Sequence, residues 1–411
     1  MVSVAPAPLM VSEPGSFAEY TIVRRKPAII TEIIARNTYA SDIVSELGAF
    51  GSEIASGLVA PLHEEASDAP FWHDAWRPWR GKTWRELPWF FAETYFYRRL
   101  LEVVRYFQPG PWHLLDPFEP QKREVLLQGL ETLSAFHASL PGNLPLEEQF
   151  TLWLERSLWG NRADLSNAAT LAKAHHITRE DTKRLLINHT RGVWQLVAGG
   201  GVRRLDVVAD NSGLELLSDL ALLDFLLSHD LVDTAYLHLK GQPFFVSDAM
   251  VKDLTTTLTA LRDAQAEELR LLGQRLDKAF GAGRLIACDH PFWTMCLPFR
   301  QFPDDLRDTL GSSDLILLKG DANYRRLIDD RHWPPTSDLA TIAAHMPSSF
   351  LALRTLKGEL LVGLPEGLAE KLASEDPTWL INGERGLIHL VQLPTESACR
   401  PQDRDATYRA Y

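Results

Sequence analysis

The spacing of apolar residues divides the chain into two halves with different patterns. From about residue 28 to residue 192, apolar residues recur at helical intervals, as in residues 88–107, where Trp89, Ala92 and Phe96 fall on one side of a helix. The dense tryptophans of this half offer the large apolar area that packing between helices needs. The first half is therefore predicted to be helical.

From about Arg204 onward, short β-rich runs alternate with helical ones. Helices are expected over residues 214–230 and 248–280. This alternation is typical of parallel strands joined by crossover helices. The candidate strands are residues 205–209, 234–239, 243–247, 284–288, 314–319, 350–355, 359–364 and 386–392.

These two patterns predict an α/β protein with two domains. A helical N-terminal domain, residues 1–195, precedes a three-layer αβα domain, residues 196–411, with a mainly parallel open sheet. The length of 411 residues is enough for two domains with large buried cores. In an open sheet, ligands bind beyond the carboxyl ends of the strands, so the residues that follow each strand are the candidates for chemistry.

Composition and charge narrow the class of ligand. Hydrophobic residues make up 45% of the chain and charged residues 23%, which are globular proportions. The 42 lysines and arginines against 54 aspartates and glutamates give a net charge of −12. No general positive field is therefore available to hold nucleic acid or an anionic membrane, and an anionic ligand must meet a local positive site.

Cysteine usage and the N-terminal residues favour a soluble cytoplasmic protein. Cys288, Cys296 and Cys399 are odd in number and lack CxxC spacing, which argues against a disulfide framework and against a structural zinc site. The N-terminal residues lack the basic start and unbroken apolar run of a signal peptide, and no apolar stretch long enough to span a membrane follows.

Oxygen-bearing side chains follow two of the candidate strands. Asp210 and Asn211 come directly after residues 205–209, and Asp248 follows residues 243–247. Two carboxylates and one amide oxygen suit a small hard cation and leave coordination positions for water and substrate. Taken alone, the first pair also fits a polar turn before a helix, and Asp248 fits a helix N-cap.

Amide and positive side chains follow two further strands. In residues 320–325, Gly-Asp-Ala-Asn-Tyr-Arg, the glycine lets backbone amides approach an anion, Asn323 adds donors and Arg325 could supply a fork for phosphate. Lys357, after the next candidate strand, is a compact positive charge of the kind that neutralises phosphoryl oxygens. Each also fits an ordinary turn or surface residue. One topology brings all four strand ends to the same crevice, which indicates metal-assisted chemistry on an anion.

Several familiar sites are missing from the sequence. No glycine-rich loop ends in Gly-Lys-Ser or Gly-Lys-Thr, no HExxH zinc motif occurs, and no Gly-x-Ser-x-Gly elbow is present. These absences argue against a phosphate loop, a zinc protease and a serine esterase.

Seven segments in chain order match a known family. They are residues 24–34, 88–100, 158–166, 209–227, 244–250, 317–327 and 353–360. As a set they resemble the DUF89 family of damage-control metal phosphatases, over most of the chain from about Arg24 to Leu364. The likeness is closest to the branch that carries an RTxK motif, here residues 354–357.

The resemblance implies a helical N-terminal domain and an αβα domain, with a divalent metal, Mn²⁺, Co²⁺, Ni²⁺ or Mg²⁺, at the carboxyl edge of the sheet. Carried across motif by motif, the family's metal ligands fall on Asp210, Asn211 and Asp248. Its phosphate and substrate contacts fall on Glu215, Asp321, Asn323, Arg325 and Lys357.

Two further positions bear on the substrate. Asn161 and Asp164 match a motif of the helical domain that is expected to close over the site and contact substrate. Ala322 stands where the family usually has a bulkier apolar residue such as leucine, which changes the expected shape of the pocket.

The resulting hypothesis is a metal-dependent phosphatase acting on a small phosphorylated metabolite, such as the sugar phosphate fructose 1-phosphate. Asp210 and Lys357 are the predicted catalytic residues. Lys357 offsets charge on the phosphoryl oxygens, and either Asp210 or a metal-bound water is the nucleophile.

Two alternatives belong to other functional classes. A name attached to this branch of the family claims carboxyl methylation with S-adenosylmethionine, but methyl transfer needs no divalent metal, and residues 210–213 replace the expected glycine-rich loop. A non-catalytic binding protein on the same fold would have lost a metal ligand or the lysine, and this chain keeps both.

Overall fold

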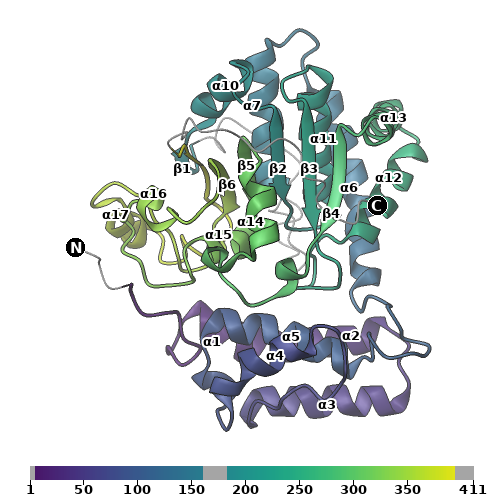
Figure 1. The fold of residues 1–411 in the computed structure, drawn as a ribbon, viewed down its shortest axis with the longest axis vertical. Coiled ribbons are helices and arrows are strands. Elements are labelled where there is room, and N and C mark those ends of the chain that lie inside the picture. The colour runs from purple at the N-terminus through teal and green to yellow at the C-terminus, as the bar shows by residue number, and fades with distance from the viewer. Residues whose placement is uncertain (1–4, 161–182, 394–411) are drawn as a thin grey trace.

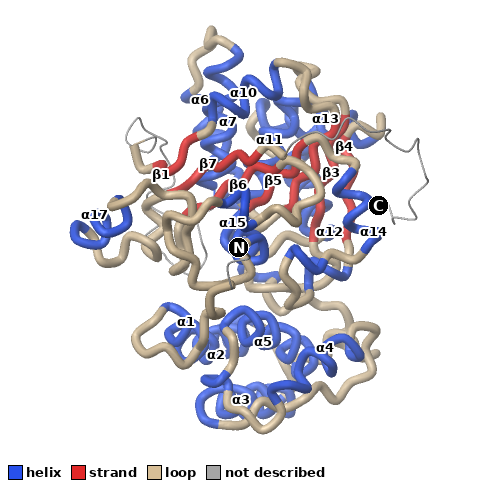
Figure 2. The backbone as a smooth tube through the Cα atoms, turned by 60° about the vertical axis from the view of Figure 1, so that its left-hand side comes forward, coloured by secondary structure: helices blue, strands red, loops and turns tan. Residues whose placement is uncertain are grey.

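The computed structural model describes residues 5–160 and 183–393, and at their centre lies one seven-stranded sheet (Figures 1 and 2). The strand order is β1-β7-β6-β5-β2-β3-β4, and neighbours are parallel except β6 and β7. The strands are β1 (Leu185–Asn188), β2 (Arg204–Val208), β3 (Thr234–Leu239), β4 (Leu285–Asp289), β5 (Leu315–Lys319), β6 (Phe350–Thr355) and β7 (Gly386–Val391). The predicted α/β fold with a mainly parallel open sheet is confirmed.

Both faces of the sheet are buried, which is why its strands read as continuous apolar runs. Along β5, Leu315 and Leu317 join one hydrophobic cluster, while Ile316 and Leu318 join another. The first cluster packs under α6 (Glu119–Ser139), α7 (Leu146–Trp159), α10 (Thr190–Ala198), α11 (Leu214–Ser228), α12 (Val251–Arg262) and α13 (Glu267–Gly281). The second packs under α14 (Asp304–Gly311), α15 (Gly320–Leu327), α16 (Leu339–Ile342) and α17 (Leu368–Glu375). Helices on both faces give the three predicted layers.

A separate helical layer lies at one end of the sheet (Figure 1). Its elements are α1 (Phe17–Tyr20), a π-helical turn (Thr21–Arg25), α2 (Lys26–Arg36), α3 (Ser41–Ser56), α4 (Ala69–Trp76) and α5 (Trp89–Val103). The α5 helix is buried on nearly all sides, and the rings of Phe96 on α5 and Phe50 on α3 stack with centroids 5.5 Å apart. The aromatic residues of this layer therefore form its core, as expected from the sequence.

Two predicted strands do not form. Residues 243–247 make a turn, because Phe245 has a φ of 52° in the left-handed region and interrupts the extended backbone. Residues 359–364 are buried but irregular, since their backbone groups bond elsewhere: the Val362 amide donates to the Tyr324 hydroxyl at 3.2 Å. Both runs are apolar because they are buried or half-buried, not because they pair in the sheet.

Two other elements differ from the prediction. The helix expected over residues 248–280 is a pair, α12 and α13. Gly273 permits the pair to pack closely, because a Cβ there would lie 3.2 Å from the Arg262 backbone nitrogen. The edge strand β1 has only four residues, Leu185–Asn188, and was not predicted.

The domain division at residue 195 stays a prediction. The helices α6 and α7 precede that position and pack against α11 and the sheet, whereas α1–α5 form the separate layer. Among the described residues, no helix is both long and apolar enough to cross a membrane.

Candidate active site

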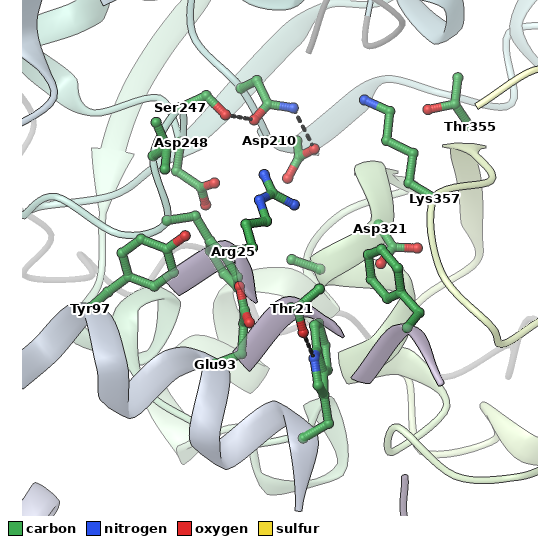
Figure 3. Close-up of a pocket in the computed structure, with 16 residues that line it drawn as sticks. Thr21, Arg25, Glu93, Tyr97, Asp210, Ser247, Asp248, Asp321, Thr355 and Lys357 are labelled. Atoms are coloured by element: carbon green, nitrogen blue, oxygen red, sulfur yellow. Dashed lines mark hydrogen bonds between the residues drawn. The ribbon is translucent and has the colours of Figure 1, made fainter. Parts of the chain in front are cut away.

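A cavity lies between the helical layer and the loops that follow the parallel strands (Figure 3). From the helical layer it is lined by Phe17, Thr21, Arg25, Trp89, Glu93 and Tyr97. From the sheet side it is lined by Asp210, Asn211, Phe245, Val246, Ser247, Asp248, Asp321, Ala322, Thr355 and Lys357. Residues that follow β2, β3, β5 and β6 thus meet at one place, as the parallel topology requires.

Asp210 and Asn211 end β2 in a tightly bonded corner. The Asn211 side-chain amide donates to Asp210 Oδ2 and to Glu215 Oε2, both at 2.8 Å. The Ser247 hydroxyl donates to Asn211 Oδ1 at 2.5 Å. Glu215, on the first turn of α11, is buried and is not among the described residues that line the cavity. In this arrangement Glu215 orients Asn211.

A loop, not a strand, carries Asp248 to the same corner. The Ala249 amide donates to the Asp210 carbonyl at 2.8 Å, which joins this loop to the end of β2. From the other side, Lys240 Nζ lies 3.0 Å from Asp248 Oδ2, and Lys122 Nζ donates to the Asp248 carbonyl at 2.8 Å. The structure therefore brings together the three predicted metal ligands.

Burial and like charge destabilise ionised carboxylates in this corner. Burial raises the pKa of Asp210 well above its ordinary value, and the negative charges of Glu215 and Asp248 raise it further, against Lys240 and Lys357. Burial also raises the pKa of Asp248, and the nearby Lys240 ammonium only partly offsets this rise. A bound cation would relieve this repulsion, and two carboxylates with an amide oxygen are the donors that a hard divalent ion prefers.

A second acidic cluster is already neutralised. Carboxylate oxygens of Asp116, Glu119 and Asp253 lie within 4.8 Å of one another, a spacing that could hold an ion. However, Lys122 Nζ lies 3.0 Å from Asp116 and 2.8 Å from Asp253, and Lys252 Nζ lies 3.1 Å from Asp116. Two ammonium groups thus supply the positive charge here. The cluster anchors Lys122, which in turn holds the loop that carries a metal-ligand candidate.

Residues 320–325 begin α15, and their charged side chains bond within the protein. Asp321 accepts from Arg354 Nε at 2.7 Å and from Arg325 Nε at 2.6 Å. Arg325 also donates to Asp330 at 2.5 Å and lies over the Trp89 ring. Burial opposes ionisation of Asp321, but the guanidinium groups of Arg354 and Arg325 lower its pKa to about 2. Asp321 therefore lines the cavity as a paired carboxylate, and Arg325 lies behind it.

Asp321→Asn is expected to lower the unfolding free energy of the protein, by an amount that depends on pH. Because the folded-state pKa is depressed to about 2, the carboxylate contributes stability above its unfolded pKa, and this contribution is lost as the pH falls through about 2. At neutral pH the loss should be about 2 kcal/mol of unfolding free energy. Urea unfolding of wild type and variant should be measured at a series of pH values from 7 downward. The difference between their unfolding free energies should narrow below about pH 4. A constant gap across that range would contradict the ion-pair explanation.

Asn323 and Gly320 shape the corner without facing the cavity. Asn323 Nδ2 donates to the Lys319 carbonyl at 2.8 Å and to the Val208 carbonyl at 3.3 Å, so it ties together the ends of β5 and β2. A Cβ at Gly320 would lie 1.9 Å from Asp210 Oδ2, and Gly320 has a φ of 79°. Only glycine fits between α15 and the Asp210 carboxylate.

Gly320→Ala is expected to displace Asp210 and to cost about 10²-fold in activity, since a shift of about 1 Å in a catalytic group has that effect. Gly367→Ala is the matched control, because Gly367 has a φ of 80° and a methyl group there would have no atom beyond its chain neighbours within 4 Å. It should show only the stability cost of a left-handed alanine, about 1 kcal/mol. Equal activity in the two variants would show that the contact with Asp210 is unimportant.

Thr355 and Lys357 reach the cavity from the RTxK motif, and the Lys357 ammonium points toward the side where Asp210 lies (Figure 3). Thr355 is 1% exposed, and its hydroxyl has no hydrogen-bond partner among the described residues. Arg354 does not line the cavity but donates to Asp321 and to the Gly358 carbonyl, so it holds the loop that presents the lysine.

The helical layer contributes cavity residues that the sequence analysis did not assign. The Arg25 guanidinium extends toward Asp210 and Asp248, and Glu93 and Tyr97 lie on the same wall (Figure 3). The sequence did contain a signal for Glu93, because it is a charged residue within a largely aromatic and apolar stretch of the helix. In the sequence analysis that helix was explained by packing alone, and the glutamate was not considered. The candidates Asn161 and Asp164 lie outside the described residues.

The model of the damage-control phosphatase ARMT1-like domain matches residues 21–372 of this chain. The chain belongs to this family. Damage-control phosphatase ARMT1 of Rattus norvegicus is 32% identical, over 93% of this chain and 98% of that protein. The ARMT1 protein of Danio rerio is 31% identical, over 91% of this chain and 94% of its own length.

A solved structure supports the fold of this ARMT1-like chain. A DUF89 family protein from Pyrococcus horikoshii superimposes with a TM-score of 0.50 at 14% sequence identity, covering 90% of this chain and 98% of that one. At that identity the likeness shows a shared fold. The family and the phosphatase class predicted from the sequence are thus confirmed.

Proposed function

We propose that this ARMT1-like phosphatase depends on a divalent metal and hydrolyses phosphate monoesters of small metabolites, with sugar phosphates such as fructose 1-phosphate as candidate substrates. The observation that carries the proposal is the convergence of Asp210, Asn211 and Asp248 at one cavity that Lys357 also lines. Oxygen donors for a hard cation beside an ammonium group suit an ester with a doubly charged phosphoryl group.

Each residue has a distinct role in this proposal. Asp210, Asp248 and the Asn211 amide oxygen hold the ion, which when bound withdraws negative charge from the phosphoryl group. Lys357 neutralises a phosphoryl oxygen that the ion does not reach, and the buried Thr355 hydroxyl, which has no hydrogen-bond partner among the described residues, donates to another. Asp210 either accepts the phosphoryl group or orients the attacking water.

The test is phosphate release from a panel of sugar phosphates with Mg²⁺, Mn²⁺, Co²⁺ or Ni²⁺, with and without chelator. We expect release that requires a metal and that disappears in Asp248→Ala. Release that persists in that variant or in chelator would overturn the proposal. Tight, metal-independent binding of S-adenosylmethionine in calorimetry would favour methyl transfer instead.

A further inference from the structure

One carboxylate of the helical layer faces the cavity and uses only one of its two oxygens. Glu93, on α5, is 3% exposed and lines the cavity. Its Oε1 accepts a hydrogen bond from the Lys26 ammonium, but its Oε2 has no hydrogen-bond partner among the described residues. Leaving a buried carboxylate oxygen without a donor is costly, so an arrangement of this kind suits a donor that a ligand brings.

The charge of this carboxylate is already balanced. Lys26 is fully buried, donates to the Tyr97 hydroxyl at 3.2 Å, and lies 4.3 Å from the centre of the Tyr97 ring. Burial lowers the pKa of Lys26, and the negative charge of Glu93 raises it, which leaves the pKa at about 8. The ammonium therefore persists at neutral pH. Because Lys26 neutralises Glu93, the missing partner of Oε2 is a neutral donor and not a second cation.

The position of Glu93 excludes the phosphoryl group as its ligand. Glu93 lies on the helical wall with Tyr97 and Thr21, across the cavity from Asp210 and Lys357 (Figure 3). A doubly ionised phosphoryl group only accepts hydrogen bonds, so it cannot supply the donor that Glu93 Oε2 lacks, and the proposed function assigns it to the opposite wall. The group that meets Glu93 therefore belongs to the alcohol part of the ester.

We propose that Glu93, neutralised by Lys26, is a specificity-determining residue that accepts a hydrogen bond from a hydroxyl group of the alcohol moiety. The inference rests on the proposed phosphatase function and narrows its substrates to phosphate esters of polyhydroxylated alcohols. Esters of simple alkyl alcohols leave Oε2 without a donor and bind less well.

The first test varies the substrate and leaves the protein intact. Glycerol 1-phosphate and propyl phosphate have the same three-carbon chain and differ only in hydroxyl groups. Since a hydrogen bond to a charged group is involved, wild type should prefer glycerol 1-phosphate by about 10- to 100-fold in kcat/KM. The metal-loaded protein should also show a larger rise in melting temperature with glycerol 1-phosphate than with propyl phosphate.

The second test removes the acceptor. Lys26→Met/Glu93→Leu removes both charges together and leaves no polar side-chain atom for the hydroxyl group, so we expect the ratio of the two kcat/KM values to fall close to one. If this variant does not fold, Glu93→Gln replaces it. There Lys26 holds the amide oxygen and the NH₂ group donates to the hydroxyl oxygen, so a bond to a charged acceptor becomes a weaker neutral bond and the ratio should fall severalfold. Glu53→Gln is the matched control, because Glu53 pairs with Arg99 inside the helical layer away from this cavity and should keep the preference.

The outcomes separate this inference from the proposed function. If no ester is hydrolysed with any metal, the proposed function fails. If both esters are hydrolysed equally well by wild type, or if the Glu93 variants keep the full preference, only the assignment of Glu93 is overturned. A preference lost in the Glu93 variants and kept in Glu53→Gln supports it.

Discussion

Asp210→Asn is expected to abolish metal-dependent phosphate release, with a loss of at least about 10³-fold in kcat/KM, or about 4 kcal/mol of transition-state stabilisation. The variant loses a carboxylate that the structure places beside Asn211 and Asp248 in the proposed metal corner. The same carboxylate is a candidate nucleophile, so both routes of the proposed reaction lose a required group.

The same substitution should make the metal-free protein more stable. Burial and the charges of Glu215 and Asp248 raise the pKa of Asp210, so its ionised form is disfavoured in the folded state at neutral pH. Asparagine keeps the shape of the side chain and removes that repulsion. Thermal unfolding in chelator should therefore give a higher melting temperature for Asp210→Asn than for wild type. Added Mn²⁺ should raise the melting temperature of wild type only.

Asp224→Asn is the control, because Asp224 lies on α11, the helix that follows the Asp210 loop, and pairs with Arg275 on α13. This variant should lose no activity and gain no stability in chelator. If Asp210→Asn were instead less stable than wild type without metal, and still stabilised by Mn²⁺, then Asp210 would be a structural residue and the metal would bind elsewhere.

The convergence at the cavity was predictable because parallel topology alone decides it. Any residue directly after β2, β5 or β6 must reach the same edge, which places Asp210, Asp321 and Lys357 from sequence order. Asp248 lines the same cavity for a different reason than the predicted strand: the preceding apolar residues form a turn, and backbone hydrogen bonds to the β2 loop carry Asp248 to the corner. An apolar pattern reports burial, and it does not say whether the backbone pairs with a sheet.

The roles of the charged groups were less predictable, because they depend on partners distant in sequence. The Arg325 guanidinium could bind phosphate with two nitrogens, but it forms ion pairs with Asp321 and Asp330 instead. In the sequence, Glu93 is one polar position in an aromatic helix, and only the structure shows that Lys26 pairs with one of its oxygens while the other has no hydrogen-bond partner among the described residues. Such assignments need the three-dimensional packing of the helical layer against the sheet.

Lys357→Met is expected to lower kcat by about 10²- to 10³-fold, the usual cost of removing one group that stabilises charge in a transition state. Asp210→Asn should weaken metal binding, whereas Lys357→Met should not. The Lys357 charge lowers the pKa of Asp210, which means that the ammonium already stabilises that carboxylate in place of a cation. Without the ammonium, the corner is more negative and should bind Mn²⁺ at least as tightly as wild type does.

Calorimetric titration with Mn²⁺, together with steady-state kinetics on one sugar phosphate, distinguishes the two roles. Lys357→Arg should recover part of kcat, since it restores the charge on a differently shaped group. Lys371→Met on α17 is the control for loss of a lysine, because Lys371 is 67% exposed and pairs only with Glu375 among the described residues. A Lys357→Met protein that bound Mn²⁺ more weakly would show that the lysine supports the metal corner, and its assignment to the phosphoryl group would be wrong. Tight metal binding with slow turnover would instead show that the two roles belong to different residues. Asp210 and Asp248 would hold the ion on one side of the phosphoryl group, and Lys357 would stabilise the transferred group from the other.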